Sequence, residues 1–185
     1  MRLRRKLHGL TLEPLTGASA RDYFALFQLE PGFHLDSAAL ERAYHTLLSQ
    51  FHPDRFAGKP QVEQRVAAQL CADINSGFRT LSNEVARAEY VLKRAGVDLA
   101  QAEREGVGAA FLMTQIELRE RLESTDAEDA AARHTLLAEI GEGYGAARDA
   151  FANAVKSQCF HDAARHWQEM LYFAKLRDAA RPRAR

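Results

Sequence analysis

The chain has 185 residues, 46% of them hydrophobic, and its 25 basic residues balance its 25 acidic residues. This apolar content is sufficient for a folded core, in one domain of ordinary size or in two small ones. The balanced charge excludes a general attraction to nucleic acid or to an anionic membrane, so any binding must come from a local surface.

The first twenty residues are expected to form a flexible extension. They read MRLRRKLHGLTLEPLTGASA, in which Glu13 and Pro14 interrupt any apolar signal sequence. The basic start is also compatible with a weak mitochondrial presequence, but a disordered tail or an upstream start codon is the simpler interpretation. No apolar run approaches the roughly 18 residues of a membrane helix. We therefore expect a cytoplasmic protein with no membrane partner and no nucleic-acid partner.

From Asp22 onward the apolar residues recur at helical spacing and nowhere show sustained alternation, which predicts an all-α fold. The segment RDYFALFQLE is a short first helix that is closed by Pro31 and Gly32. Asp36 or Ser37 is placed to cap the helix that follows.

The next two helices are predicted to form an antiparallel hairpin. The stripe of the first runs through Leu40, Tyr44, Leu47, Leu48 and Phe51. The stripe of the second runs through Val62, Val66, Leu70, Ile74, Phe78 and Leu81. Pro53 ends the first helix and forces His52 into a loop, whereas Pro60 fits the first turn of the second. The loop 52–59 is therefore expected to lie exposed at the tip of the hairpin.

Ser82 or Asn83 restarts the chain into a further helix, for which Gly96 is the expected C-cap. Three more helical stretches follow, near 109–123, 127–156 and 160–179, and a three-helix bundle is their natural packing. The predicted organisation is an extension, a first domain, a linker and a helical second domain, at residues 1–20, 21–96, 97–108 and 109–180.

Two helices of the second domain have more apolar residues than one buried stripe requires. In the first, Leu112, Met113 and Ile116 lie opposite Phe111, Leu118 and Leu122. In the last, Tyr172 and Leu176 project away from a predicted core stripe of Phe160, Ala164, Trp167, Leu171 and Ala174. These additional residues indicate either unusually deep packing or an exposed patch for a partner.

The stretch FHPDRFAGK allows three interpretations. A histidine at a helix C-terminus, followed by proline and aspartate, is accounted for as a plain helix stop. A hydrolase based on His52 and Asp54 would need a nucleophile and a pocket, and the close titratable neighbours Arg55 and Lys59 supply neither. A metal site is disfavoured because Cys71 and Cys159 lie far apart, and both are expected to be buried thiols.

Taken with their surroundings, these residues resemble the J-domain co-chaperones, whose signature is a His-Pro-Asp loop between two antiparallel helices. Here the signature is His52, Pro53 and Asp54, with DYFALFQLE before the hairpin and INSGFRTLSN and RAEYVL after the loop. The resemblance implies that the loop binds a DnaK-type or HscA-type ATP-dependent chaperone. Members commonly carry several basic residues on the second helix, whereas this chain has only Arg42 and His45 there, so Arg55 and Lys59 in the loop are expected to compensate.

The segment GAAFLMTQIELRERLE, with the helical tail after it, narrows the resemblance to the HscB family of iron–sulfur co-chaperones. That family binds an IscU-type scaffold through its tail domain. The matching positions here are Leu112, Met113, Ile116, Glu117, Glu120 and Tyr172. The resemblance implies a two-domain adaptor that stimulates the chaperone ATPase and has no catalytic residue, metal or cofactor of its own. The alternative within the same class is a general J-domain adaptor for a different client.

Overall fold

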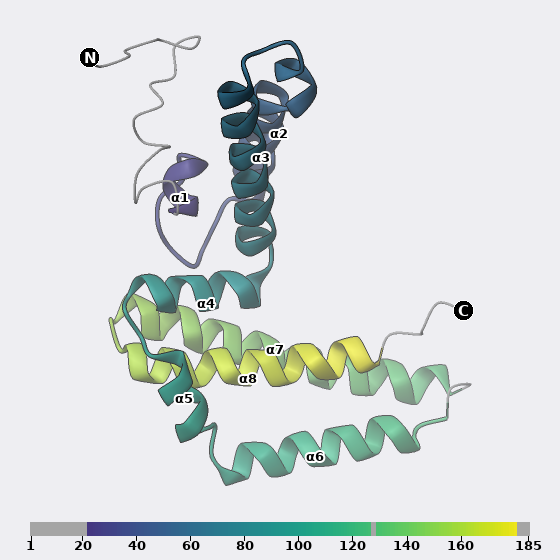
Figure 1. Cartoon of the computed structure of the whole chain (residues 1–185). Helices are drawn as coiled ribbons and strands as arrows, with labels where there is room; N and C mark the ends of the chain where they lie inside the picture. Colours follow the sequence, from purple (N-terminus) through teal and green to yellow (C-terminus); the bar gives the residue numbers. More distant parts are fainter. Residues whose placement is uncertain (1–21, 127–128, 181–185) are drawn as a thin grey trace. The chain divides into compact units, whose positions relative to one another are not determined.

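The computed structural model describes residues 22–126 and 129–180, and within these residues the chain is helical with no strand (Figure 1). The all-α prediction is confirmed. The chain divides into two compact units, Met1–Arg87 and Ala88–Arg185, which are described separately. The predicted extension 1–20 lies outside the described residues.

Three α-helices and one 3₁₀ turn lie wholly within the described residues of the first unit. They are α1 (Tyr23–Leu26), α2 (Ser37–Phe51), η2 (Pro53–Phe56) and α3 (Gln61–Ser82). Asp36 caps α2 as predicted, because its Oδ1 accepts a hydrogen bond of 3.0 Å from the Ala39 backbone N–H. Asp22 caps α1 in the same way, accepting from Phe24 N at 3.0 Å.

The predicted hairpin of α2 and α3 is present, and both helices contribute to its core. Leu40 and Ile74 are buried from the two sides. The Tyr44 ring stacks on Phe78 with centroids 4.1 Å apart, and its hydroxyl is 3.0 Å from Asn75 Oδ1. This stack and this hydrogen bond fix the register of the two helices.

The predicted stripe of α3 is wrong at its first two positions. Val62 is 72% exposed and Val66 is 40% exposed, whereas Ala67 is buried. Steps of four residues turn about 40° too far on each repeat of an α-helix. The buried Ile74 marks the side of α3 that faces the core. Around the helix axis, Val66 points about 80° away from Ile74 and Val62 about 120° away. Ala67, seven residues before Ile74, points almost the same way as Ile74.

A glycine allows α1 to pack against α3. An added Cβ at Gly77 would lie 2.9 Å from both Phe27 Cε2 and Tyr23 Cδ1. The aromatic rings of α1 and its C-cap thus rest directly on the backbone of α3, and Phe24 between them is fully buried. Any larger residue at this position would push α1 away from the hairpin.

Helix α4 (Glu84–Arg94) begins and ends where the sequence indicates. Asn83 Oδ1 accepts from Ala86 N at 2.9 Å. Gly96 has φ +80°, and the Val97 N–H reaches the Leu92 carbonyl at 3.1 Å, which forms a Schellman C-cap. The division between the two compact units falls inside this helix, after Arg87. A domain boundary at residue 96 therefore stays a prediction.

The second unit continues through four further helices. They are α5 (Leu99–Glu105), α6 (Ala109–Ser124), α7 (Ala130–Lys156) and α8 (Phe160–Ala179). The last three match the predicted stretches closely. The expected linker 97–108 stays a prediction, and the structure places α5 inside this segment. Gln168 of α8 donates a 2.7 Å hydrogen bond to the Ala102 carbonyl, and Ala102 and Val107 are buried.

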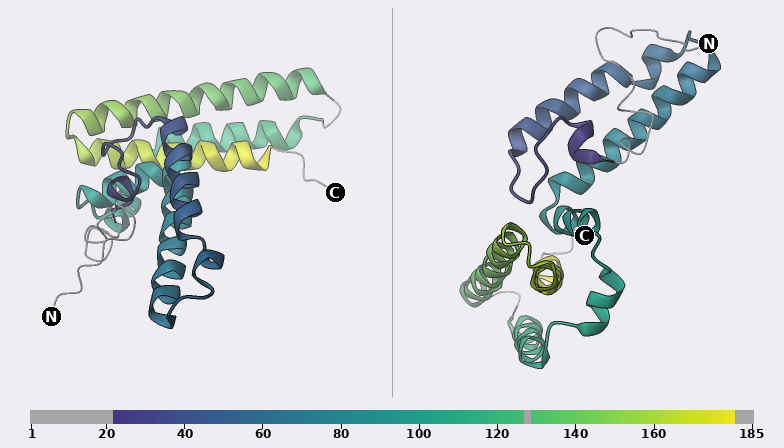
Figure 2. Two further views of the ribbon diagram at one scale, coloured as in Figure 1. Left: turned by 90° about the horizontal axis from the view of Figure 1, so that it is seen from above. Right: turned by 90° about the vertical axis from the view of Figure 1, so that its left-hand side faces the viewer.

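Helix α8 occupies the centre of the second unit, with α5, α6 and α7 arranged around it (Figure 2, right). Because neighbours cover it on several sides, its buried surface is wider than one stripe. Leu176 is 2% exposed, so the prediction that it projects outward is wrong, whereas Tyr172 is exposed as predicted. Only two of the most deeply buried side chains of α8, Ala164 and Trp167, belong to the predicted stripe. The others are Ala163, Met170 and Leu176.

The prediction that both cysteines are buried is also wrong. Cys71 is half-buried in α3, and Cys159 is exposed in the turn between α7 and α8.

The described parts of the chain contain no group of three His, Cys, Asp or Glu side chains able to hold a metal ion. None of the helices in those parts is long and apolar enough to cross a membrane.

Candidate functional site

Two surfaces carry the residues that the sequence singles out. The first is the HPD tip, formed by His52, Pro53 and Asp54 between α2 and α3. Pro53 starts the 3₁₀ turn η2, while His52 takes φ −57° and ψ 131° and so leaves the helical conformation. The side chains of His52 and Asp54 are 52% and 90% exposed. The loop is exposed at the end of the hairpin as predicted.

The histidine and aspartate of the HPD tip interact with each other. Asp54 N donates to His52 Nδ1 at 3.3 Å, and Asp54 Oδ2 lies 3.5 Å from the same nitrogen. The tip therefore presents an imidazole ring and a carboxylate to solvent in a fixed local arrangement.

Three hydrogen bonds from side chains to backbone carbonyls hold the loop after the tip. Arg55 Nη1 donates to the Ser49 carbonyl in the last turn of α2 at 3.0 Å. Gln64 Nε2 donates to the Ala57 and Lys59 carbonyls at 3.2 Å and 2.8 Å. Arg55 thus caps α2, a structural role that adds to its predicted role in binding, and the loop is ordered by the chain itself.

Arg42 lies away from the tip. It stands ten residues before His52 on α2, which corresponds to about 15 Å along a helix axis. Its guanidinium is exposed and lies 3.8 Å from Asp36 Oδ2. The structure therefore places Arg42 on the same hairpin as His52 without bringing the two together.

The HPD tip is suited to recognition rather than to catalysis. The His52 and Asp54 side chains are surrounded by solvent, and the following turn supplies Arg55 but no nucleophile. A hydrolase would need its base in a pocket beside a nucleophile and a group that stabilises developing charge. An exposed imidazole, a carboxylate and a proline in a rigid turn instead offer a compact polar contact for a partner.

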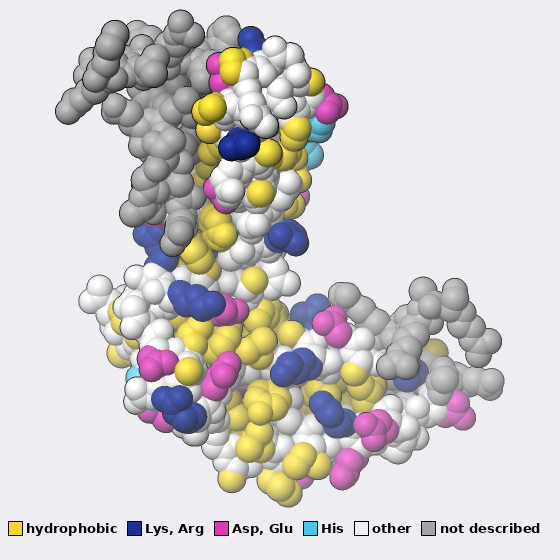
Figure 3. Space-filling model, viewed as in Figure 1, with side chains coloured by type: hydrophobic (Ala, Val, Ile, Leu, Met, Phe, Trp, Pro, Cys, Tyr) yellow, Lys and Arg dark blue, Asp and Glu magenta, His cyan; other side chains and the backbone are white. Residues whose placement is uncertain are grey.

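The second surface is the α6/α8 apolar face, formed by Leu112, Met113 and Ile116 of α6 and Tyr172 of α8. Their exposed fractions are 39%, 57%, 50% and 37%. Figure 3 shows hydrophobic side chains gathered over α6 and α8, with Lys and Arg side chains at the margin. Of the two interpretations that the sequence left open, deep packing is excluded for these four residues because they are exposed, and the partner stays a prediction.

Aromatic contacts join the two helices at this face. The Phe111 ring meets the Tyr172 ring edge to face, with centroids 5.8 Å apart, and meets Phe173 at 5.5 Å. The sequence places Phe111 on the core side of α6, and the structure finds it half-buried. Its contact with Tyr172 depends on how α6 and α8 are aligned, for which the sequence pattern gives no signal.

Acidic side chains extend the face along α6. Glu117 and Glu120 follow Met113 and Ile116 by four residues each, so they lie on the same side of the helix, and both are exposed. Lys175 Nζ lies 5.8 Å from the centre of the Tyr172 ring on α8. The face therefore combines an apolar centre with charges of both signs, the usual composition of a protein-binding surface.

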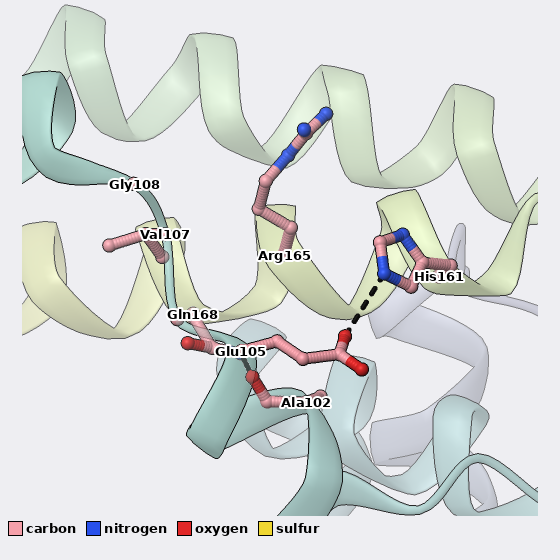
Figure 4. Close-up of a pocket in the computed structure, with 8 residues that line it drawn as sticks. Ala102, Glu105, Val107, Gly108, His161, Arg165 and Gln168 are labelled. Carbon is pink, nitrogen blue, oxygen red and sulfur yellow. Dashed lines mark hydrogen bonds and ion pairs between the residues drawn. The ribbon is translucent and has the colours of Figure 1, made fainter.

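The second unit also has a pocket of about 240 Å³ between α5 and α8 (Figure 4). His161 Nε2 is 3.0 Å from Glu105 Oε2, while Arg165 points away from that pair. Hydrogen bonds from Gln101 and from His161 lower the pKa of the Glu105 carboxyl. The pair of Glu105 and His161 joins α5 to α8, whereas Arg165 pairs with Asp162 of its own helix at 3.3 Å, so the residues of this pocket hold α5 against α8.

Comparison with known proteins places this chain in a family. The family model of the HSCB C-terminal oligomerisation domain matches residues 107–181. The co-chaperone protein HscB of Proteus mirabilis is 36% identical over 161 residues, which are 85% of this chain and 92% of that protein. The HscB homolog of Aromatoleum aromaticum is 49% identical over 107 residues, and this match spans 58% of this chain and 60% of that protein.

Solved structures agree with the sequence matches. The chaperone HscB from Vibrio cholerae superimposes with a TM-score of 0.78 at 30% identity, over 85% of this chain and 94% of that one. Human co-chaperone HscB gives a TM-score of 0.84 at 22% identity over 97% and 92%, a likeness of fold alone.

A helical hairpin with an exposed His-Pro-Asp turn, followed by a separate helical unit, defines a J-domain co-chaperone. Within that class, the chain belongs to the HscB family of co-chaperones.

Proposed function

We propose that this protein holds an IscU-type iron–sulfur scaffold on its α6/α8 apolar face and presents it to an HscA-type or DnaK-type ATP-dependent chaperone through the HPD tip. It acts in the cytoplasm and stimulates the ATPase of the chaperone. The iron–sulfur cluster is cargo of the scaffold, and this chain supplies no cofactor and no catalytic group.

The observation that carries the proposal is the separation of the two surfaces on different compact units. The tip is ordered by Arg55 and Gln64 within the hairpin, and the apolar face is built only from helices of the second unit. Both partners can then be bound at once. A tethered scaffold has a high effective concentration at the chaperone, so binding at one site promotes encounter at the other.

The stimulation needs no chemistry from this chain. If His52, Asp54 and Arg55 contact the chaperone more favourably in the state that follows ATP hydrolysis, their binding energy shifts the chaperone toward that state. The chaperone keeps the nucleotide, the metal and the catalytic groups. Arg55 next to the tip and Arg42 further along α2 add positive charge to the hairpin, so we expect weaker docking at high salt.

Single-turnover ATP hydrolysis by an HscA-type and a DnaK-type chaperone, with and without this protein, tests the proposal. We expect a several-fold faster rate with at least one of them. A pull-down of the scaffold, with Leu112→Ala as the weakened variant, tests the second surface separately. Stimulation without scaffold capture would instead favour an adaptor for a different client, and no stimulation of either chaperone would contradict the proposed function.

A further inference from the structure

Three aromatic rings connect the buried centre of the second unit to its exposed apolar face. At the inner end, a Cβ added to Gly143 of α7 would overlap the Phe173 ring, so this ring lies directly on the α7 backbone. Phe173 is 7% exposed and belongs to the core. The absence of a side chain at Gly143 fixes how closely the ring of α8 approaches α7.

Phe111 of α6 lies next in the series and touches two consecutive residues of α8. Its ring is 5.5 Å from Phe173 at an interplanar angle of 88°, and 5.8 Å from Tyr172 at 71°. Both are edge-to-face contacts, the arrangement that aromatic pairs favour. Consecutive helical residues point about 100° apart, so a single ring can meet both only when α6 and α8 keep one alignment.

At the outer end, Tyr172 is in contact on two sides. Phe111 meets its ring, and Lys175 Nζ lies 5.8 Å from the ring centre. The residue is nevertheless 37% exposed, so part of its surface remains open to a partner. A side chain that is already held in one conformation loses less entropy when it is bound.

We propose that Phe111 is a positioning residue of the α6/α8 apolar face. Its ring, supported by Phe173, sets the place of Tyr172 relative to Leu112 and Ile116 and so prepares the face for its partner. This proposal rests on the proposed function, because it concerns the same face. Phe111 itself does not need to touch the scaffold. It acts by keeping the one contact residue on α8 aligned with those on α6.

The test uses the full chain with Phe111→Leu, which removes the ring and keeps an apolar side chain. We expect the scaffold affinity to fall about fivefold, since Tyr172 must then be ordered on binding. Phe111→Tyr keeps the ring and should bind within about twofold of the original protein. Leu122→Ala is the matched control: Leu122 is half-buried on the same helix but lies away from the face, so it should cost stability and leave affinity unchanged.

A spectroscopic measurement separates positioning from a general structural effect. The chain has five tyrosines, so 3-fluorotyrosine labelling gives five ¹⁹F resonances, and Tyr172→Phe assigns the one from Tyr172. In the Phe111→Leu variant that resonance should move toward its unfolded position while the other four stay in place. Leu122→Ala should leave all five unchanged.

Two results would overturn the proposal: a Tyr172 resonance that does not respond to Phe111→Leu, or a scaffold affinity equal to that of the original protein while Leu112→Ala still weakens binding. If Leu112→Ala also leaves binding unchanged, the proposed function fails at this face. The fluorine shift would then still decide whether Phe111 positions Tyr172.

Discussion

The HPD tip and the α6/α8 apolar face are assembled in opposite ways. The tip consists of three consecutive residues, and local hydrogen bonds from Arg55 and Gln64 order the loop that follows them. The face takes its residues from two helices, and the Phe111 contacts between those helices align them. A polar contact can be encoded in one loop, whereas an apolar surface requires the packing of a whole unit.

The difference has a consequence for mutation. Side chains of the tip contribute little to the core, so their replacement should change function without changing stability. Residues of the face lie on a packed core, so the effect of a substitution on stability depends on how buried the side chain is. Leu112 is 39% exposed, whereas Leu118, six residues further along α6, is 3% exposed. The predictions below use this difference, beginning with the largest effect.

His52→Gln and Asp54→Asn should each abolish the several-fold stimulation of the chaperone ATPase, because removing a central interface contact weakens binding by about tenfold or more. The melting temperature should change little, because both side chains are exposed. Single-turnover hydrolysis with thermal melts measures both properties. If either variant unfolds the protein, or if stimulation survives both, the loop acts only as a helix stop.

The triple variant Leu112→Ala, Ile116→Ala, Tyr172→Ala should lower scaffold affinity by about a hundredfold, a loss typical of several interface anchors. Its fold should be retained, since all three side chains are exposed. Leu118→Ala is the buried control and should cost about 2–5 kcal/mol of unfolding free energy. Calorimetric titration and thermal melts distinguish the two. A collapsed melting transition in the triple variant would assign these residues to the core.

Gln115→Met should raise the unfolding free energy of the second unit by about 1 kcal/mol. Gln115 is 6% exposed beneath the face, and neither atom of its amide has a hydrogen-bond partner among the described residues. Methionine has a similar length and removes the unpaired polar atoms. Denaturant titration measures the change, and scaffold affinity should stay the same. A destabilised variant would show that the amide does have a partner.

The smallest effect concerns pH. A bidentate salt bridge, with N–O distances of 2.9 Å and 2.7 Å, joins Arg121 of α6 to Glu139 of α7 and lowers the pKa of the Glu139 carboxyl. A lowered folded-state pKa stabilises the protein above the unfolded pKa, and this contribution is lost as the pH falls through the folded value. Both side chains are about half exposed, so the effect is small.

The measurement is a comparison of Glu139→Gln with the original protein in denaturant titrations between about pH 6 and pH 3. The original protein should lose more stability over the acidic part of this range, and the two curves should approach each other at the lowest pH. Parallel curves would mean that the ion pair contributes nothing to the fold.

The sequence predicted the fold well wherever one residue determines a local conformation. Pro53 ends α2, Asp36 begins it, and Gly96 ends α4 because its positive φ allows the Schellman turn. For the same reason the exposed HPD tip could be predicted from the motif and its flanking helices.

Predictions failed where the outcome depends on several neighbours at once. Val62 and Val66 fit a repeat of four residues, but the helix turns them away from the core. Leu176 lies off the predicted stripe, yet it is buried because several helices cover α8. The contact of Phe111 with Tyr172 was not predicted, since it requires the alignment of helices from distant parts of the chain.

The central claim is that one chain links a chaperone and a scaffold through two separate surfaces. Steady-state ATPase of the chaperone, measured against the concentration of this protein with and without scaffold, tests it most directly. The original protein should stimulate, and scaffold should increase that stimulation. The triple variant should keep the basal stimulation but lose the increase, and His52→Gln should lose both. A His52→Gln protein that stimulates normally, or a triple variant that still responds fully to scaffold, would contradict the account.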